Sequence, residues 1–454
     1  MGKMKSNTIK IRRGLDIAVK GIARRETSSM FDERMYAVKP TDYVGVVPRL
    51  LVAEGDSVLA GTPLMEDKNN PLAKFVSPVS GTVKAVVRGE RRAIQAVVVE
   101  SDGEMRSVAC TQLDLSNCTA DELKSRMVET GLWTLLLQRP YGIVPREGSA
   151  PKAVFVSGFD SSPLPIDMDY ILEKSIADFQ TGVDVLQRLA GMVYLSLHSS
   201  QKGGLLDAVR NAQIHYFEGP HPAGLTGTHI AYIDPINKGE TVWTVNAQDV
   251  AVIGRYFRTG KYCPERVVAL CGPEVANPRY YRMFAGASIA QLAAMVGDKN
   301  VRFVCGDILS GTSIAPDGFL SCRANKVCVL PEGDYYDFMG WLRPNFKKLS
   351  FSRTFISGLF GNKGNVFYTI DTGMHGSRRP LFVTGEFEKL VPLDIYPLQL
   401  IKACVVGDVE RMEELGIYEV EPEDLALCEF ADTSKTEIQA AIRAGLEKVR
   451  MENC

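Results

Sequence analysis

Short stretches in which apolar and polar residues alternate fill the first hundred residues, and glycine turns separate them. Residues 54–58 and 61–64, for example, precede a similar stretch at 77–83. Alternation with a period of two predicts β-strands that bury one face. We therefore expect this part of the chain to consist of short strands joined by tight turns.

The pattern changes at about residue 152. Apolar runs occur at Val154–Val156, Met192–Leu197 and Ile214–Phe217, and an amphipathic stretch with helical spacing occupies residues 173–190. Strands that alternate with helices are joined by right-handed crossovers into a parallel sheet. The sequence therefore predicts a parallel α/β domain here.

Two segments match the capping box, in which a Ser or Thr side chain and a Glu or Gln three residues later satisfy the first free amides of a helix. One starts at Thr119 and predicts a helix that buries Leu123 and Met127 and stops at Gly131. The other starts at Ser288, between strands expected at 267–270 and 301–304. We expect a helix to begin at each.

The C-terminal part has the spacing of helices. Pro422 suits a first helical position, because its missing amide hydrogen is not needed there. A last helix is expected to begin at residues 434–437. Its apolar stripe consists of Ile438, Ala441, Ile442, Leu446 and Val449.

These patterns together predict a multidomain protein of the α/β and α+β classes. Residues 1–105 resemble the barrel-sandwich hybrid of biotinyl and lipoyl domains, and residues 106–258 form a Rossmann-like α/β domain. Residues 259–325 resemble the soluble-ligand-binding (SLBB) β-grasp domain. Residues 326–454 hold a basic, aromatic segment and a C-terminal helical domain.

Lys68 lies near a hairpin of the first domain, where carriers of this fold attach biotin or lipoate to a lysine. Attachment requires the lysine on an exposed two-residue turn. Residues 69–71 are expected to lengthen the hairpin and move its tip away from Lys68. A structural use of the fold is therefore the preferred interpretation.

Composition excludes several classes of function. Lys and Arg number 52 against 54 Asp and Glu, so the net charge of −2 predicts no nucleic-acid partner. The ten cysteines contain no Cys-x-x-Cys pair, which favours neither a metal site nor an iron–sulfur cluster. No apolar run approaches the length of a membrane helix.

The segment Gly219–His229 follows an expected strand and comes close to the phosphate-binding loop G-x-x-x-x-G-K-[ST]. Leu225 stands where that loop has its lysine, and two prolines remove amide donors. We expect a rigid loop for packing or a partner rather than a nucleotide site. The residues of interest are Gly219, Pro220, His221, Pro222, Gly224, Gly227 and His229.

Three further features are candidate sites. His215, His221 and His229 lack a nearby carboxylate or cysteine, so no metal is predicted. Residues 310–313 are similar to sites of phosphoester-linked flavin, but a turn is the preferred interpretation. The acid-free segment 341–355 interleaves cations with aromatic rings, which suits a membrane surface or partner, single-stranded nucleic acid, or simply a strand with a basic face. Its docking candidates are Trp341, Arg343, Phe346, Lys347, Lys348 and Arg353.

Several segments, in order, resemble the NqrA family, the first of the subunits of the bacterial sodium-translocating NADH:quinone oxidoreductase. They are residues 13–16, 66–68, 77–81, 88–92, 131–134 and 219–229. The resemblance runs from Ile9 to the last helix, and Gly219–His229 carries most of its specificity. The architecture is similar to the flavin subunit of respiratory complex I, but without its glycine-rich flavin loop.

The resemblance implies a peripheral subunit on the cytoplasmic face of the inner membrane, joined to five partner subunits and especially to the membrane subunit NqrB. NAD, the flavins and the iron–sulfur centres are then held by those partners, and this chain has no tightly bound cofactor. In some members a second cysteine follows the one that matches Cys428; Asp432 stands in its place here, so no functional pair is expected.

Quinone is a candidate ligand, because the NqrA family has been associated with it. Trp133, Arg139, Pro140 and Tyr141 would supply an apolar ring surface and a cation; the alternative is an ordinary buried helix end. No catalytic residue is assigned, and we do not expect the isolated chain to be catalytic. A non-catalytic adaptor of a redox membrane complex and a flavin- or nucleotide-binding oxidoreductase are the alternatives.

Overall fold

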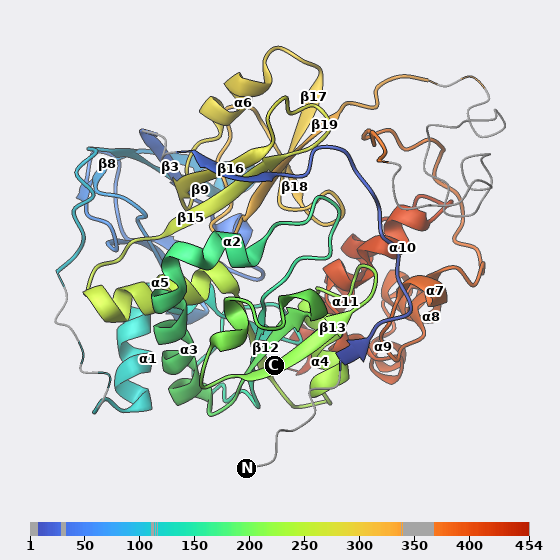
Figure 1. The fold of residues 1–454 in the computed structure, drawn as a ribbon, viewed down its shortest axis with the longest axis horizontal. Coiled ribbons are helices and arrows are strands. Elements are labelled where there is room, and N and C mark those ends of the chain that lie inside the picture. Colours follow the sequence, from blue (N-terminus) through green and yellow to red (C-terminus); the bar gives the residue numbers. More distant parts are fainter. Residues whose placement is uncertain are drawn as a thin grey trace.

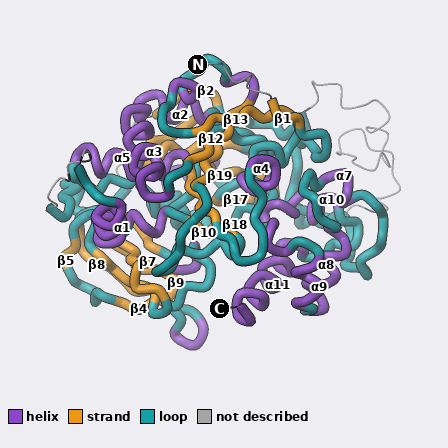
Figure 2. The backbone as a smooth tube through the Cα atoms, turned by 90° about the horizontal axis from the view of Figure 1, so that it is seen from below, coloured by secondary structure: helices purple, strands orange, loops and turns teal. Residues whose placement is uncertain are grey.

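The computed structural model describes residues 8–28, 33–109, 113, 115, 117–336, 338 and 367–453. A small β-domain and a group of C-terminal helices lie at opposite ends of the long axis, and two six-stranded sheets lie between them (Figure 1). Figure 2 shows the same division from below, with β4, β7 and β8 far from α8, α9 and α11. The predicted mixed multidomain class is confirmed.

The barrel-sandwich domain consists of two small antiparallel sheets, with strand orders β3-β9-β8-β5 and β4-β6-β7. Its interior holds alternate residues of facing strands, such as Leu64 and Phe75, as the period-two pattern predicts. The strands are β3 (Met35–Val38), β4 (Pro48–Leu50), β5 (Ser57–Val58), β6 (Pro63–Asp67), β7 (Asn70–Val76), β8 (Gly81–Arg88) and β9 (Ile94–Ser101).

The expectation for Lys68 is wrong in its geometry. Asp67 pairs with Asn70, so Lys68 and Asn69 form an exposed two-residue turn and the hairpin is not lengthened. The turn forms because the Asp67 carboxylate accepts the amide of Asn69 at 3.1 Å. Its base is held, however, since Asn70 donates to the carbonyls of Val144 and Pro145. The hairpin therefore packs against the next domain rather than standing free.

The second sheet has the order β1-β13-β12-β11-β14-β10, and all strands except β10 run parallel. The predicted parallel α/β arrangement is thus present, with an antiparallel edge strand added. The strands are β1 (Thr8–Lys10), β10 (Leu137–Arg139), β11 (Val154–Ser157), β12 (Val193–His198), β13 (Gln213–Glu218) and β14 (Val242–Asn246).

Helices cover both faces of this sheet. Val154 and Val156 of β11 pack in the same cluster as residues of α3 (Ile176–Ala190) and α5 (Ala247–Thr259), whereas Phe155 packs with Ile230 of α4 (Thr226–Ile233). Because successive side chains of a strand point to opposite faces, α4 lies across the sheet from α3 and α5.

The β-grasp sheet has the order β18-β17-β19-β15-β16-β2 and carries α6 (Ala290–Val296). The capping box predicted at Ser288 is wrong. Ile289 is the N-cap and has no side-chain cap bond, and the Ser288 hydroxyl accepts only the amide of Ala290. The strands are β2 (Arg24–Ser28), β15 (Glu265–Cys271), β16 (Arg279–Phe284), β17 (Val301–Cys305), β18 (Thr312–Ile314) and β19 (Lys326–Pro331).

The first described residues belong to neither end of the molecule. Strand β1 pairs with β13 of the parallel sheet, and β2 pairs with β16 of the β-grasp sheet. The chain therefore crosses both central sheets before the barrel-sandwich domain begins. The boundaries at 105, 258 and 325 stay predictions.

The C-terminal helices enclose a core of their own that includes Ile438, Ile442, Leu446 and Val449 of the predicted stripe. The last helix begins later than expected, because the Asp432 carboxylate accepts the amides of Ser434 and Thr436 and holds them in a turn. The helices are α7 (Phe387–Leu390), α8 (Pro397–Val406), α9 (Val409–Glu414), α10 (Ala426–Ala431) and α11 (Ile438–Asn453), with Pro422–Leu425 a 3-10 turn.

The remaining α-helices are α1 (Ala120–Glu129) and the short α2 (Met168–Leu172). Helix α1 has the predicted capping box: Thr119 accepts the amide of Glu122, and the Glu122 carboxylate accepts the amide of Thr119. Leu123 and Met127 are buried, as expected.

Replacing Thr119 by Ala should lower the free energy of unfolding by about 1 kcal/mol, because an amide at the start of α1 loses its acceptor. Thr119→Ser keeps the hydroxyl and should stay within a few tenths of a kcal/mol of the parent, by about the same reasoning. Urea denaturation followed by circular dichroism measures both. Equal stabilities of the two variants would contradict the cap.

Candidate functional site: the carboxyl edge of the parallel sheet

Ligands of open α/β sheets bind outside the carboxyl ends of the strands, at the point where the strand order reverses. The chain here moves from β11 to β12 and β13 on one side and then returns to β14 on the other, so that point lies at β11. The segments at this edge are residues 158–162 after β11 and Gly219–His229 after β13.

The Gly219–His229 loop sits between β13 and α4, as the sequence predicts. Each backbone N–H group from residue 220 to residue 225 is already bound by the chain, and the two prolines have none. Such a loop has no amide left in this stretch for a phosphate. The donor–acceptor pairs are His221 to Asp16 (2.9 Å), Ala223 to Pro220 (2.9 Å), Gly224 to Ser161 (2.7 Å) and Leu225 to Pro222 (2.9 Å).

The glycines of this loop allow close approach by other parts of the same chain. A Cβ at Gly219, which has φ of +146°, would collide with the carbonyl of Ile11, and a Cβ at Gly227 would collide with the Asp424 carboxylate. Asp424 thus occupies the start of α4, where a phosphate lies in nucleotide-binding relatives of this fold. The motif fixes contacts within the molecule.

The two loop histidines are buried and neutral. His221 faces the Ser161 hydroxyl at 3.1 Å, and burial lowers its pKa. His229 bonds through Nε2 to the carbonyl of Ala223 at 2.9 Å, and burial lowers its pKa to about 3. Its ring packs on Phe217, with the ring centres 4.5 Å apart. Among the described residues, no group of three histidines, cysteines or carboxylates could hold a metal ion.

A buried ammonium fills the rest of the edge. Lys326, at the start of β19 in the β-grasp domain, donates to Asp160 at 2.8 Å and Ser162 at 2.5 Å. Burial alone would lower the pKa of Lys326, but the charge of Asp160 outweighs it, so the pKa is raised. The loop after β11 therefore closes around a cation of the chain itself.

Three of the quinone candidates occupy the opposite, β10 side of the sheet. Trp133 is fully buried, donates to the carbonyl of Pro145 at 2.9 Å and meets Trp243 edge-on at 5.1 Å. Trp243 pairs with Gln138, so the next side chain along β10, Arg139, points to the other face. The structure does not bring Trp133 and Arg139 together.

Arg139 is neutralised within the molecule. It is 4% exposed and donates to Asp424 at 2.9 Å and Glu423 at 2.8 Å. Burial alone would lower its pKa, but these carboxylates raise it. Pro140 is buried, and half-buried Tyr141 accepts a hydrogen bond from Arg443 at its carbonyl. The four residues join the sheet to the C-terminal helices, and quinone contact at them stays a prediction.

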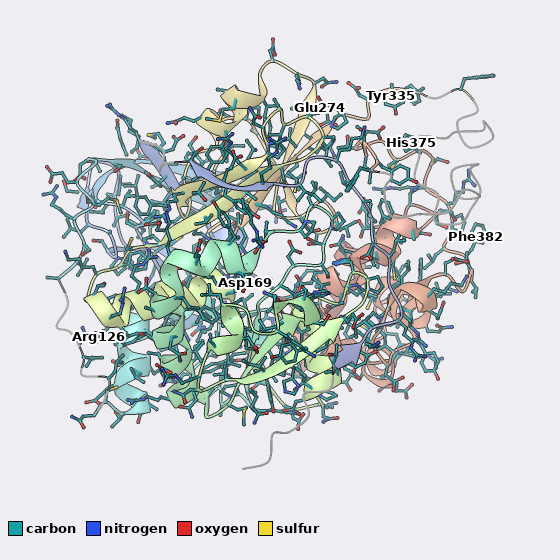
Figure 3. The ribbon with its side chains drawn as sticks, in the orientation of Figure 1. Arg126, Asp169, Glu274, Tyr335, His375 and Phe382 are labelled. Carbon is teal, nitrogen blue, oxygen red and sulfur yellow. The ribbon has the colours of Figure 1, made fainter. Side chains whose placement is uncertain are left out.

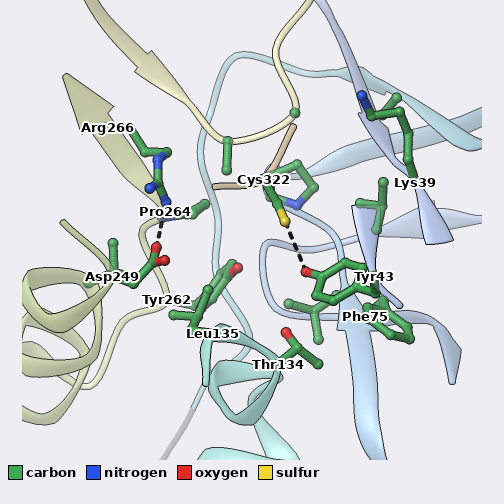
Figure 4. Close-up of a pocket in the computed structure, with 17 residues that line it drawn as sticks. Lys39, Tyr43, Phe75, Thr134, Leu135, Asp249, Tyr262, Pro264, Arg266 and Cys322 are labelled. Atoms are coloured by element: carbon green, nitrogen blue, oxygen red, sulfur yellow. Dashed lines mark hydrogen bonds and ion pairs between the residues drawn. The ribbon is translucent and has the colours of Figure 1, made fainter. Parts of the chain in front are cut away.

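A small cavity lies where the barrel-sandwich, α/β and β-grasp domains meet (Figure 4). Its volume is about 40 Å³, which suits a few water molecules and is far below that of ordinary ligand pockets. The Cys322 thiol and the Tyr43 phenol lie 3.0 Å apart in it, and Arg266 donates to Asp249 at 2.5 Å. This cavity is too small for a quinone ring.

The remaining candidates fall in two groups. Residues 310–313 follow a turn in which Asp307 accepts the amides of Leu309 and Ser310, as the turn interpretation predicts. Cys428 is buried, and Asp432 holds the turn before α11. The docking candidates Trp341, Arg343, Phe346, Lys347, Lys348 and Arg353 lie outside the described residues.

Sequence reasoning missed the charged residues that complete this edge: Asp160, Lys326 and Asp424. Each follows or precedes a strand or helix and is unremarkable in its local sequence. Their partners lie more than 160 positions away along the chain, so no local pattern could have paired them.

Fold and site place the chain in a class of multidomain subunits with this domain order. Sequence models of the NqrA N-terminal barrel-sandwich hybrid domain, the NqrA second α/β domain and the NQRA C-terminal domain match residues 9–102, 118–262 and 267–315.

Relatives with assigned names give the family. The NqrA subunit of the Na+-translocating NADH-quinone reductase of Actinobacillus pleuropneumoniae serotype 5b (strain L20) is 36% identical over 453 residues, covering 98% of this chain and all of that protein. Its counterpart in Haemophilus influenzae (strain 86-028NP) is 38% identical over 451 residues, with the same coverage. The chain belongs to the NqrA family of Na+-translocating NADH-quinone reductase subunits.

Solved structures are more distant. An NAD+-reducing [NiFe]-hydrogenase in the air-oxidized state aligns with a TM-score of 0.33 at 14% identity, covering 48% of each chain. At this level it adds nothing to the assignment. In the part of the chain that the structure describes, no helix has both the length and the apolarity needed to cross a membrane.

Arg139→Met should lower the free energy of unfolding by about 3–5 kcal/mol, because Asp424 is then left buried without its cation. Lys84→Met, which breaks the exposed pair with Glu100, is the control and should cost at most about 1 kcal/mol. Urea denaturation followed by circular dichroism measures both changes. Similar losses in the two variants would argue against a structural role for Arg139.

Stability should fall in mild acid because of His229. An unfolded histidine titrates near 6.5, whereas burial lowers the pKa of His229 to about 3. Between these values the unfolded chain binds one more proton, so the free energy of unfolding decreases as the pH falls. We expect this histidine to contribute a loss of about 2–3 kcal/mol between pH of roughly 6.5 and 4.5.

His229→Phe removes that proton while keeping a ring against Phe217, so its unfolding free energy should depend less on pH. His221 remains and keeps part of the dependence in the same direction. Urea titrations at a series of pH values give both slopes. Identical slopes for parent and variant would refute the assignment.

Proposed function

We propose that this chain is a peripheral, cofactor-free subunit of a sodium-pumping NADH:quinone reductase, on the cytoplasmic face of the membrane. In this proposal it organises the partner subunits, the membrane subunit NqrB above all, so that quinone reduction can proceed. The five partners hold NAD, the flavins and the iron–sulfur centres. The names of its relatives, with full coverage of both chains, support a place in such a complex.

The observation that carries the organising role is the occupied carboxyl edge. Lys326 fills the loop after β11, Asp424 covers the start of α4, and the loop amides are bound internally. A chain that uses its own side chains where relatives of its fold bind nucleotides is suited to holding domains in place. This argues against the alternative of a flavin- or nucleotide-binding oxidoreductase.

Exposed apolar side chains near the C-terminal helices favour docking at that end. Tyr335 and Phe382 point away from the body of the molecule in Figure 3, and they are 51% and 55% exposed. Clustered exposed apolar residues mark interaction sites on soluble surfaces. The others in this part are Tyr336, Phe338, Phe367, Met374 and Val383.

The role of quinone in this proposal is indirect. Trp133 has no exposed surface, and the charge of Arg139 is balanced by carboxylates. We therefore assign quinone contact to the assembled complex rather than to residues 133 and 139–141 of this chain. A photoreactive quinone that labelled this chain in the intact complex at those residues would overturn the assignment.

Deleting the gene for this chain tests the proposal. Without it, the other subunits should fail to co-purify as one complex, and NADH-driven quinone reduction and sodium uptake by membrane vesicles should be lost. Supplying the chain from a plasmid should restore all three. A complex that assembles, reduces quinone and pumps sodium without this chain would refute the organising role.

A further inference from the structure

The hairpin between β8 and β9 ends in two arginines with an unusual backbone. Arg91 and Arg92 have φ values of +51° and +60° and are the central residues of a turn closed by the bond from the Ala93 amide to the Glu90 carbonyl. Positive φ at both central positions is the type I′ turn, which strongly prefers Asn-Gly. Arginine is strained there, because its Cβ crowds the backbone in the left-handed region.

Nothing within the described residues compensates for this strain. The guanidinium groups of Arg91 and Arg92 take part in no side-chain hydrogen bond or ion pair among them, and every residue from 87 to 93 is exposed. Arg88 beside them donates only to the carbonyl of Arg92, at 3.1 Å. Strain of this kind persists where it fixes side chains for a function outside the local fold.

We propose that this hairpin tip, residues 87–93, is a docking surface for an acidic patch on another folded subunit of the complex. The inference rests on the organising role proposed above and adds a second contact region to it. Arginine forms paired hydrogen bonds with carboxylates, and exposed Val87 supplies an apolar contact beside the cations.

The fixed backbone favours a folded protein over a lipid surface. Anionic headgroups are fluid and attract cations in any arrangement, so flexible lysines without strain would serve equally well. Carboxylates on a folded partner have fixed positions, and only they reward two arginines held in one orientation. The partner is therefore expected to present at least two neighbouring acidic side chains.

The position of the tip fits this role. Strand β8 lies at one end of the long axis, whereas Phe382 and the C-terminal helices lie at the other (Figures 1 and 3). Contacts at both ends would let one chain bridge two neighbours, as an organising subunit must.

Three variants of the full-length chain separate charge from strain. Arg91→Asn with Arg92→Gly removes both, and should raise the melting temperature while weakening binding to the complex about 10-fold or more. Arg91→Gln with Arg92→Gln keeps the strain and removes the charge, so binding should weaken with no change in melting temperature. Arg91→Lys with Arg92→Lys keeps the charge but not the paired hydrogen bonds, and should weaken binding less.

Binding is measured by titrating each purified chain into membranes from the strain that lacks it, with recovered quinone reduction as a second readout. Wild-type affinity should also fall more steeply with salt than that of the Asn-Gly variant. The inference is overturned if the Asn-Gly variant binds as tightly as the wild type. It is also overturned if phosphatidylglycerol vesicles bind the wild type and lose the Asn-Gly variant while membranes bind both equally. Failure of the organising role is seen separately, in the deletion strain alone.

Discussion

The arrangement of the domains depends on burying cations and pairing each with a carboxylate from another part of the chain. Lys326 of the β-grasp domain enters the loop after β11 and meets Asp160, and Arg139 at the sheet edge meets Asp424 before the last helices. A third pair, Arg266 with Asp249, joins β15 to α5. A buried charge without its partner costs several kcal/mol, about 3–5 by the usual measure, so each pair resists separation of the domains it joins. These contacts set the domain geometry more than hydrophobic packing alone would, because they tolerate only one registration.

The same pairs explain why a sheet of nucleotide-binding design has no vacant phosphate position at this edge. An anion site at a helix start needs free amides and an open approach. Here the amides between residues 220 and 225 bond within the chain, and Asp424 brings a negative charge of the protein itself to the start of α4. The carboxylate then serves two partners, since it also balances Arg139. Phosphate binding and domain fixation compete for one place, and in this structure the second prevails.

Local patterns in the sequence are sufficient for the elements and for the class of fold. The period of two predicts the strands around Phe75, the helical stripe at 438–449 predicts α11, and the residues around Thr119 predict a true capping box. They fail where a distant group decides the outcome. Ser288 has the same local signature as Thr119, yet Ile289 is the N-cap of that helix. The turn at Lys68 is missed, because Asp67, which closes the turn by accepting an amide, reads locally as an ordinary strand end. The candidate site depends almost wholly on partners more than 160 positions apart, which no periodicity encodes.

The Gly219–His229 segment shows how a motif can identify a family without performing its chemistry. Its glycines admit Ile11 on one side and Asp424 on the other, and its first histidine amide bonds to Asp16. The loop is therefore the place where the N-terminal strand, the parallel sheet and the C-terminal helices meet. Substituting any of these glycines would displace a backbone or a charged group of another domain, rather than a ligand. The constraint on these residue types arises from three-way packing, and packing of this kind keeps a sequence pattern as strictly as catalysis does.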